Sequence, residues 1–322
     1  MKYSKILATG GYLPEKVLRN ADLEKMVATS AEWIWERTGI EERHIAAPQE
    51  TTCDLAEQAA RQALQAAAVE PATIDLIIVA TTTPDYIFPS VASQLQERLG
   101  SYGCAAFDVQ AVCTGFVYAL SIADQFIRAG TTRRVLVVGA ETFSRIINWQ
   151  DRSTCILFGD GAGAVVVEAA DEPGILSSRL HADGRHRELL WVPAGVSTGY
   201  DTTRQNAAYV TMSGSEVFKF AVNTLSRIVQ EILEASRMTI ADIDWLVPHQ
   251  ANERILVATA RKLHLPLERV INTVSTHANT SAASVPLALD VAVRDGRIQR
   301  GDTVLLEAFG GGFTWGAVLL NY

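Results

Sequence analysis

The sequence contains the same order of strand and helix patterns twice. Continuous apolar runs typical of buried strands alternate with amphipathic helical patterns in both halves. In the first half we expect strands at 75–83, 104–109, 134–141 and 161–169, and helices at 90–100 and 115–130. In the second half we expect strands at 243–250, 269–274, 303–311 and 315–322, and helices at 252–264 and 284–296. Such alternation predicts parallel or mixed sheets covered by helices on both faces.

These patterns correspond element by element. Residues 74–76 match 243–245, residues 134–140 match 302–308, and the turn at Cys113 falls opposite the turn at Asn279. We interpret this as an internal duplication of one α/β unit. It predicts an N-terminal half at residues 1–173 and a C-terminal half at residues 174–322. Cys113 and Asn279 would then start equivalent helices, one in each half, that can converge near the centre.

Composition excludes several classes of function. The 322 residues are 48% hydrophobic and 20% charged, with a formal net charge of −8. We expect no nucleic-acid partner, because phosphates require a basic face. The longest apolar runs are strand-length and fall short of the roughly 20 residues that span a bilayer, so no membrane association is expected. The cysteines lack CxxC spacing and no signal peptide is evident, which predicts a cytoplasmic protein. The histidines show no metal-ligand spacing.

Cys113 has the position of a nucleophile. It lies at the turn between the strand pattern at 105–109 and the long helical pattern that follows. The free N–H groups and the positive dipole end of that helix favour a thiolate, so we expect the pKa of Cys113 to fall below about 8.5. Two further candidates, His249 and Asn279, each follow an apolar strand-like run.

These three residues admit two enzymatic interpretations. In the first, His249 deprotonates Cys113 and Asn279 orients the histidine, as in papain-like proteases. In the second, Cys113 accepts an acyl group while His249 and Asn279 donate hydrogen bonds to the carbonyl oxygen of a second thioester. The local Ala-Val-Cys-Thr-Gly sequence lacks the papain-type signature, which disfavours the protease. The run at 309–316, FGGGFTWG, either forms a tight turn or brings backbone N–H groups against an oxyanion.

Seven motifs between residues 29 and 316 resemble the β-ketoacyl-acyl carrier protein synthase III family, which initiates type II fatty-acid synthesis. They are TSAEWIWERTGIEERHIA, FDVQAVCTGF, ILFGDGAGA, SGSEVFKFAV, DWLVPHQAN, NTSAASVPLAL and LLEAFGGGFTWG. The resemblance implies a thiolase-like fold of two duplicated α/β halves with mixed sheets layered between helices, a homodimer, and a catalytic triad of Cys113, His249 and Asn279. Asn279 favours the initiating class, because thiolases have a second cysteine there and elongating synthases a second histidine. Plant-type polyketide synthases share the triad but are longer.

The activity implied is decarboxylative condensation of an acyl-CoA primer, most simply acetyl-CoA, with malonyl-acyl carrier protein. Cys113 takes the acyl group, and His249 and Asn279 hold the malonyl thioester oxygen as CO₂ leaves. The backbone N–H groups of Cys113 and Gly311 hold the other oxyanion. Decarboxylation makes the carbanion without proton abstraction, so no catalytic carboxylate base is required. No cofactor and no metal is expected.

The resemblance also assigns residues to binding. Trp33 and Arg152 match the pair that sandwiches the adenine of CoA, and Thr29 and Arg37 match nucleotide and phosphate contacts. The pantetheine channel matches Gly214, Phe218 and Asn252, and Phe88 matches a residue that enters the acyl pocket of the dimer partner. Phe88 alone would equally be read as core. Docking of the acidic carrier protein is expected at Gln250, Ala251, Asn252, Glu253, Arg254, Arg261 and Lys262.

Three positions depart from the commonest family pattern. Ala278 replaces a glycine, which is harmless if its φ is negative. Glu253 places a carboxylate in the docking motif and is expected to weaken docking. The loop at 193–210 matches no motif, which leaves acyl-chain preference open. Two alternatives therefore remain: a paralogue that condenses or transfers longer acyl groups in secondary metabolism, and a non-catalytic module that binds acyl carrier protein or CoA.

Overall fold

The apolar runs of the sequence form two mixed β-sheets in the computed structural model, which describes residues 2–199 and 208–322. The strands are β1 (Tyr3–Tyr12), β2 (Lys16–Arg19), β3 (Glu42–Ile45), β4 (Leu76–Ala80), β5 (Ala105–Val109), β6 (Arg134–Glu141), β7 (Gly161–Ala170), β8 (Ile175–Ala182), β9 (Leu190–Trp191), β10 (Thr211–Met212), β11 (Trp245–Pro248), β12 (Thr303–Gly310) and β13 (Thr314–Asn321). The helices are α1 (Asn20–Leu23), α2 (Ala31–Thr38), α3 (Thr52–Ala67), α4 (Val91–Leu99), α5 (Gly115–Arg128), α6 (Arg152–Cys155), α7 (Gly214–Ser236), α8 (Glu253–Leu263), α9 (Val274–His277) and α10 (Ser284–Arg294).

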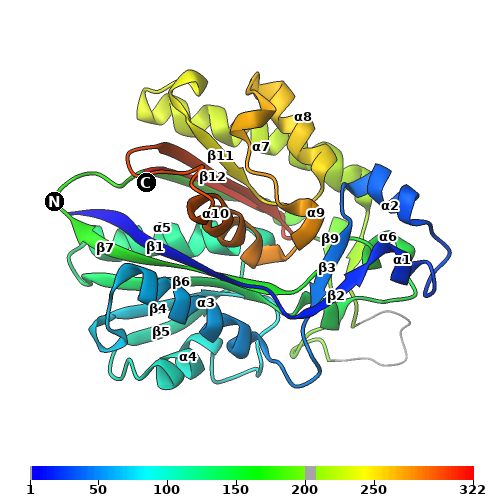
Figure 1. The fold of residues 1–322 in the computed structure, drawn as a ribbon, viewed down its shortest axis with the longest axis horizontal. Coiled ribbons are helices and arrows are strands. Elements are labelled where there is room, and N and C mark those ends of the chain that lie inside the picture. Colours follow the sequence, from blue (N-terminus) through cyan, green and yellow to red (C-terminus); the bar gives the residue numbers. More distant parts are fainter. Residues whose placement is uncertain (1, 200–207) are drawn as a thin grey trace.

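The two larger sheets and their helices form five layers (Figure 1). One sheet has the order β1-β7-β6-β4-β5 and the other β11-β12-β13-β8. Helices α5 and α10 lie between them in one continuous apolar core, α3 and α4 cover the outer face of the first sheet, and α7 and α8 cover the outer face of the second. Strands β4 and β12 are buried on both faces, which explains why their sequences are nearly continuous apolar runs.

The predicted duplication is present, with a correction of one residue. The amide of Asp75 donates to the carbonyl of Arg134 at 3.0 Å, and the amide of Asp244 donates to the carbonyl of Thr303 at 3.0 Å. Arg134 is therefore equivalent to Thr303, and the sequence-based match to Asp302 was wrong by one position. The strands of the first sheet lie within residues 3–170 and those of the second within 175–321. The boundary after residue 173 stays a prediction.

The strand expected at 269–274 does not form. Only a single bridge pairs Val270 with Leu246, and the chain then turns into α9. The side chain of Gln250 explains the difference, because it donates to the carbonyl of Ile271 at 3.0 Å and accepts from the amide of Thr273 at 2.7 Å. These backbone groups are paired with a side chain instead of a neighbouring strand. Of the loop predicted at 193–210, residues 200–207 lie outside the described residues.

Close backbone contacts hold the two halves together at their centre. Cys113 lies in the 3₁₀ turn Val112–Thr114 and its counterpart turn is Ser281–Ala283. A Cβ atom on Gly139 of β6 would lie 2.2 Å from the carbonyl oxygen of Ala282, and one on Gly310 of β12 would lie 2.9 Å from the amide nitrogen of Cys113. Each turn therefore rests on a glycine of the opposite sheet.

The backbone is strained beside these turns. Val112 and Ser281, which occupy equivalent positions, have φ values of 47° and 49°. Ala278 has φ 56° and ψ −158°, a conformation otherwise almost confined to glycine. The expectation that Ala278 is harmless required a negative φ, and φ is positive. An alanine at this position therefore holds the backbone in a strained conformation. Such strain persists only where the surrounding packing fixes the chain.

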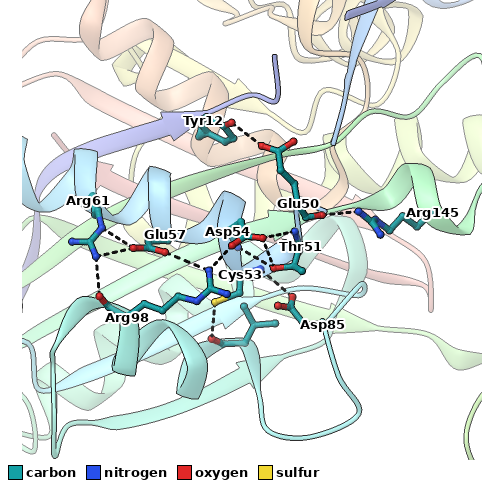
Figure 2. A network of polar contacts seen from close by, with 11 residues as sticks. Tyr12, Glu50, Thr51, Cys53, Asp54, Glu57, Arg61, Asp85, Arg98 and Arg145 are labelled. Carbon is teal, nitrogen blue, oxygen red and sulfur yellow. Dashed lines mark hydrogen bonds and ion pairs between the residues drawn. The ribbon is translucent and has the colours of Figure 1, made fainter. Parts of the chain in front are cut away.

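A polar network ties α3 to α4 and to the segment between β4 and α4 (Figure 2). Arg98 of α4 donates to Asp54 at 2.5 Å and lies 3.4 Å from Glu57, both on α3. The amide of Cys53, in the first turn of α3, donates to Asp85 at 3.0 Å. Asp85 belongs to the segment that carries Phe88, so this network fixes the base of an otherwise exposed stretch.

The strain at Ala278 makes a stability prediction. Replacing Ala278 by glycine relieves backbone strain of about 1–3 kcal/mol, which stabilises the folded state. The loss of methyl packing and the greater entropy of the unfolded chain, about 1 kcal/mol, act in the opposite direction. We expect the free energy of unfolding to change by less than about 1 kcal/mol. The control is Ala288→Gly in α10, also fully buried, which has no such relief and should lose more than about 1 kcal/mol. Urea denaturation measures both, and equal losses would contradict the strain.

Candidate active site

The three residues expected to form the triad lie on one cavity. Cys113, His249 and Asn279 line a pocket of about 560 Å³, together with residues from α2, α7 and α8. Apolar side chains, including Phe143, Ile156 and Leu225, form most of its wall. Cys113 comes from the first half and the other two from the second, so the cavity depends on the contact between the halves. Its apolar lining and few convergent polar groups are those of a small-molecule site.

Cys113 is buried at the start of α5, with 3% of its surface exposed. Burial raises the pKa of Cys113 to about 12, while a hydrogen bond with the Ser281 side chain acts in the opposite direction. The expectation that the helix lowers this pKa below about 8.5 is contradicted in direction, because removal from water disfavours the charged thiolate more than the local donors favour it. At neutral pH the resting residue is a thiol.

His249 follows β11, where its amide donates to the carbonyl of Glu307 at 2.8 Å. Burial lowers the pKa of His249 to about 3, so the imidazole is neutral at physiological pH. Its Nδ1 atom is buried without a hydrogen-bond partner among the described residues. A neutral imidazole has one N–H, which can donate to a developing oxyanion but cannot supply a full positive charge.

Asn279 follows α9 and is oriented by its neighbours. Its Oδ1 atom accepts from the amide of Ser281 at 2.9 Å, and its backbone amide donates to the carbonyl of Leu157 at 2.9 Å. With the carbonyl oxygen of its side chain occupied, the Nδ2 group remains as the donor toward the cavity that Asn279 lines. Asn279 and His249 can thus both act as hydrogen-bond donors.

The glycine run forms the tight turn expected from sequence, and its role at an oxyanion stays a prediction. Gly311 and Gly312 form the tight turn between β12 and β13. The same turn lies against the nucleophile, because a Cβ atom on Gly310 would lie 2.9 Å from the Cys113 amide nitrogen and one on Gly311 would lie 3.6 Å from Cγ2 of Val112.

Five of the residues expected to bind CoA line the cavity. They are Trp33, Arg37, Gly214, Phe218 and Asn252. The guanidinium of Arg152 lies 4.7 Å from the centre of the Trp33 ring, so the two groups already stack on each other with no room for a base between them. Thr29 has a buried hydroxyl without a hydrogen-bond partner among the described residues.

The side chain of Asn252 is engaged within the protein. It accepts from the amide of Arg254 at 2.9 Å, which caps α8, and donates to the carbonyl of Arg37 at 3.1 Å. The pair joins the start of α8 to the end of α2. Asn252 therefore shapes the cavity mouth from a fixed position.

The residues expected to dock the carrier protein divide into two groups. Arg254, Arg261 and Lys262 are exposed on α8. Lys262 donates to Asn223 on α7 at 2.6 Å, and Arg254 lies 5.6 Å from the centre of the Phe218 ring. Of these three basic residues, Arg254 also lines the cavity.

The other docking candidates are less available. Gln250 is completely buried and its amide pairs with backbone, so its side chain cannot meet a partner, which corrects the expectation. Glu253 accepts from Asn272 at 3.1 Å and packs against Gly39 at the end of α2. The Glu253 side chain is therefore directed toward the end of α2. Ala251 lines the cavity.

Phe88 does not belong to the core. It is 83% exposed, next to the exposed side chains of Tyr86 and Ile87. The core interpretation of Phe88 is therefore wrong. Together with Tyr86 and Ile87 it forms an exposed apolar surface on the segment between β4 and α4.

Sequence reasoning missed Ser281, Glu141 and Glu307. The amide of Ser281 donates to Oδ1 of Asn279 at 2.9 Å, and its hydroxyl donates to Glu141 at 3.0 Å. Glu141 and Glu307 are completely buried, and burial raises the pKa of Glu141 to about 7 and that of Glu307 to about 8. The available signal was a carboxylate within an otherwise apolar strand run, which requires a special environment.

Across residues 2–199 and 208–322, no group of three or more histidine, cysteine or acidic side chains is arranged to hold a metal ion. The helices described there include none with the length and apolarity needed to cross a membrane.

Comparison with known proteins gives a consistent result. The model of 3-oxoacyl-[acyl-carrier-protein] synthase III matches residues 107–184, and the model of its C-terminal part matches residues 233–322. The β-ketoacyl-[acyl-carrier-protein] synthase III of Thioalkalivibrio sulfidiphilus is 65% identical over 100% of both chains, and that of Methylococcus capsulatus is 61% identical over 100% of this chain and 99% of its own. The crystal structure of 3-oxoacyl-[acyl-carrier-protein] synthase III from Aquifex aeolicus has a TM-score of 0.93 and 48% identity, covering 99% of this chain and 100% of that one. The chain therefore belongs to the β-ketoacyl-[acyl-carrier-protein] synthase III family of condensing acyltransferases and has its thiolase-like fold.

Proposed function

We propose that this enzyme condenses an acyl-CoA primer, most simply acetyl-CoA, with malonyl-acyl carrier protein to give 3-oxoacyl-acyl carrier protein, CoA and CO₂. The observation that supports this most strongly is that Cys113, His249 and Asn279 line one cavity, which brings a thiol and two possible hydrogen-bond donors to the same site. The reaction initiates fatty-acid synthesis. The alternative in secondary metabolism is not favoured, because the relatives with 61–65% identity are named β-ketoacyl-[acyl-carrier-protein] synthase III. A purely binding module would not need an ordered thiol.

The first half-reaction loads Cys113. Its sulfur attacks the thioester carbon of the primer, and CoA leaves. The amides of Cys113 and Gly311 are the proposed donors to the oxyanion of this step. In the second half-reaction the malonyl thioester oxygen accepts from His249 and Asn279 as CO₂ departs, and the resulting carbanion attacks the acyl carbon on Cys113. No added base or cofactor is needed, because loss of CO₂ itself produces the carbanion.

The neutrality of His249 suits this role. A protonated imidazole would attract the malonyl carboxylate and oppose loss of its charge as CO₂, whereas a neutral donor responds mainly to charge that develops on the thioester oxygen. Because burial lowers the pKa of His249 to about 3, this state holds at physiological pH.

The proposed substrate contacts come from the family resemblance, and five of these residues line the cavity. The adenine of CoA inserts between Trp33 and Arg152, which requires their present stack to open. Thr29 and Arg37 contact the nucleotide, and the pantetheine arm passes Gly214, Phe218 and Asn252 to reach Cys113. The acidic carrier protein docks on Arg254, Arg261 and Lys262, so the two substrates approach the same channel from its outer end.

The active form is a homodimer in this proposal. β5 is an edge strand of the first sheet, and an unpaired edge is suited to pairing with a second copy. The exposed apolar side chains of Tyr86, Ile87 and Phe88 lie in the same half and would be covered by such a partner. Phe88 would then reach the partner's acyl pocket. With CoA and carrier-protein substrates, the proposed location is the cytoplasm.

Replacing Cys113 by serine tests covalent catalysis. We expect condensation to be lost, because a helix terminus contributes at most about 2 kcal/mol and cannot ionise an alcohol. Release of CO₂ from malonyl-acyl carrier protein should remain, since His249 and Asn279 are intact. Radiolabelled condensation and CO₂ assays measure the two activities, and full condensation by this variant would refute the role of Cys113.

His249→Ala and Asn279→Ala separate condensation from protease-like chemistry. Each should lower decarboxylation by roughly 10²- to 10³-fold, the usual effect of one oxyanion donor. Acylation of Cys113 by acetyl-CoA, followed by mass spectrometry, should stay largely intact. If His249 instead activates the thiol, its loss would suppress acylation and spare decarboxylation.

Charge reversal on α8 tests the docking face. Arg254→Glu, alone or with Arg261→Glu, should raise the KM for malonyl-acyl carrier protein by one to two orders of magnitude through lost attraction and new repulsion. The KM for acetyl-CoA should change less, because Trp33 and Arg152 lie on other elements. Added salt should weaken the carrier-protein step in the wild type, as surface charges are screened beyond about 8 Å. Equal changes in both KM values would place docking elsewhere.

A further inference from the structure

The direction of the Asn279 side chain depends on Ser281. Oδ1 of Asn279 accepts from the backbone amide of Ser281 at 2.9 Å, and this bond leaves the Nδ2 group to donate elsewhere. Ser281 itself has a φ of 49°, in the left-handed region that residues with a side chain seldom adopt. Such a conformation persists only where neighbouring groups hold the chain. The contacts that hold Ser281 therefore also set the direction in which Asn279 donates.

The hydroxyl of Ser281 is anchored across the contact between the two halves. It donates to Oε1 of Glu141 at 3.0 Å. Glu141 is the last residue of β6 in the first half, whereas Ser281 begins the 3₁₀ turn Ser281–Ala283 in the second. Both residues are 0% exposed, so water does not compete for this bond. Hydrogen bonds to an ionised acceptor are roughly twice as strong as those between neutral groups. The carboxylate thus fixes the strained turn from the opposite half.

Glu141 is held in turn by the segment that follows β4. Its carboxylate accepts from the hydroxyl of Thr83 at 2.5 Å, from the amide of Thr82 at 3.1 and 3.2 Å, and from the hydroxyl of Thr81 at 3.4 Å. These donors lie on both carboxylate oxygens, and a carboxylate is the side-chain group that accepts on both. The position of Glu141 therefore does not depend on Ser281, and the anchor is rigid.

Glu141 acts at a distance from the substrate. Asn279 is among the described residues that line the cavity, and Glu141 is not. The hydroxyl and then the amide of Ser281 stand between Glu141 and the Asn279 side chain. Any effect of Glu141 on the reaction through this chain of bonds is exerted on the placement of Asn279.

We propose that Glu141 is a positioning residue for decarboxylation, which holds Asn279 in its donating orientation through Ser281. The inference rests on the proposed role of Asn279 as a donor to the malonyl thioester oxygen. An oxyanion donor is effective only within about 2.7–3.1 Å of the developing charge, so a small displacement of Asn279 slows this step. The half that carries Cys113 thereby contributes to a step whose two proposed donors belong to the other half.

Glu141→Gln and Ser281→Ala test the proposal. Glutamine keeps the size of the side chain but offers one acceptor oxygen in place of two, and alanine removes the hydroxyl while the amide of residue 281 stays. At pH 8, above the pKa of about 7 to which burial raises Glu141, both variants should lower kcat for decarboxylation of malonyl-acyl carrier protein. The expected loss is on the order of 10-fold, less than for removal of a donor, because Asn279 is displaced and not lost.

Two further readings separate positioning from general damage. The KM for malonyl-acyl carrier protein should stay within about twofold, because the proposed docking residues lie on α8. Acylation of Cys113 by acetyl-CoA, followed by rapid-quench mass spectrometry, should stay within about threefold, because the proposed acylation step does not use Asn279. Retained acylation also shows that each variant is folded.

A double-mutant cycle tests the route through Asn279. Glu141→Gln and Ser281→Ala are each combined with Asn279→Ala, and the residual decarboxylation is measured. If Glu141 acts by placing Asn279, its replacement has nothing left to displace, and the rate of Asn279→Ala should change by less than about twofold. Damage to the site by another route would lower that rate again by the factor seen in the wild-type background.

A matched contact elsewhere controls for the loss of a buried bond between the halves. The hydroxyl of Thr9 on β1 donates to Asp290 on α10 at 2.6 Å, and both residues are buried. Thr9→Val removes this bond away from the cavity and should decarboxylate at the wild-type rate.

Three results would overturn the inference. They are wild-type decarboxylation in both Glu141→Gln and Ser281→Ala, equal losses of acylation and decarboxylation, and a second loss of full size in the Asn279→Ala background. If Asn279→Ala alone decarboxylates at the wild-type rate, the proposed role of Asn279 fails first, and the inference fails with it.

Discussion

The active site depends on direct backbone contact between the two halves. Gly139 of β6 lies under Ala282, and Gly310 of β12 lies under the amide of Cys113, at distances that leave no space for a side chain. Each catalytic turn is therefore fixed by the sheet of the other half. This explains why residues so far apart in sequence share one cavity, and why the turns tolerate strained values of φ at Val112 and Ser281.

The same close packing sets the electrostatics of the site. Removing Cys113 and His249 from water moves both toward their neutral forms, with the pKa of the thiol raised and that of the imidazole lowered. Two neutral groups and an amide then face the substrate, so the site stabilises charge only where the reaction creates it.

The fold was largely predictable from the sequence, because buried strands and amphipathic helices leave clear periodic patterns. The repeated order of elements indicated the duplication, and the turn after β5 identified Cys113. The errors have local causes. Arg134 was aligned with Asp302 instead of Thr303 because two apolar runs match almost equally well when one is shifted by a residue. The strand expected at 269–274 does not form because the side chain of Gln250 pairs with its backbone groups. Backbone strain at Ala278 and the burial of Cys113 could not be predicted, because both follow from tertiary contacts.

Gln250 shows how a residue read as a docking contact can serve the chemistry from inside. Its side-chain oxygen accepts from the backbone amide of Thr273, and its side-chain nitrogen donates to the carbonyls of Pro248 and Ile271. Its backbone amide donates to the hydroxyl of Ser284. These bonds join the segment that carries His249 to the chain that leads through α9 to Asn279, and to the start of α10. The spacing between His249 and Asn279, the two proposed oxyanion donors, is therefore fixed by the buried side chain of Gln250. An oxyanion donor is effective only at hydrogen-bond distance from the developing charge. In the proposed reaction, the decarboxylation step therefore depends on the bonds of Gln250 as well as on His249 and Asn279.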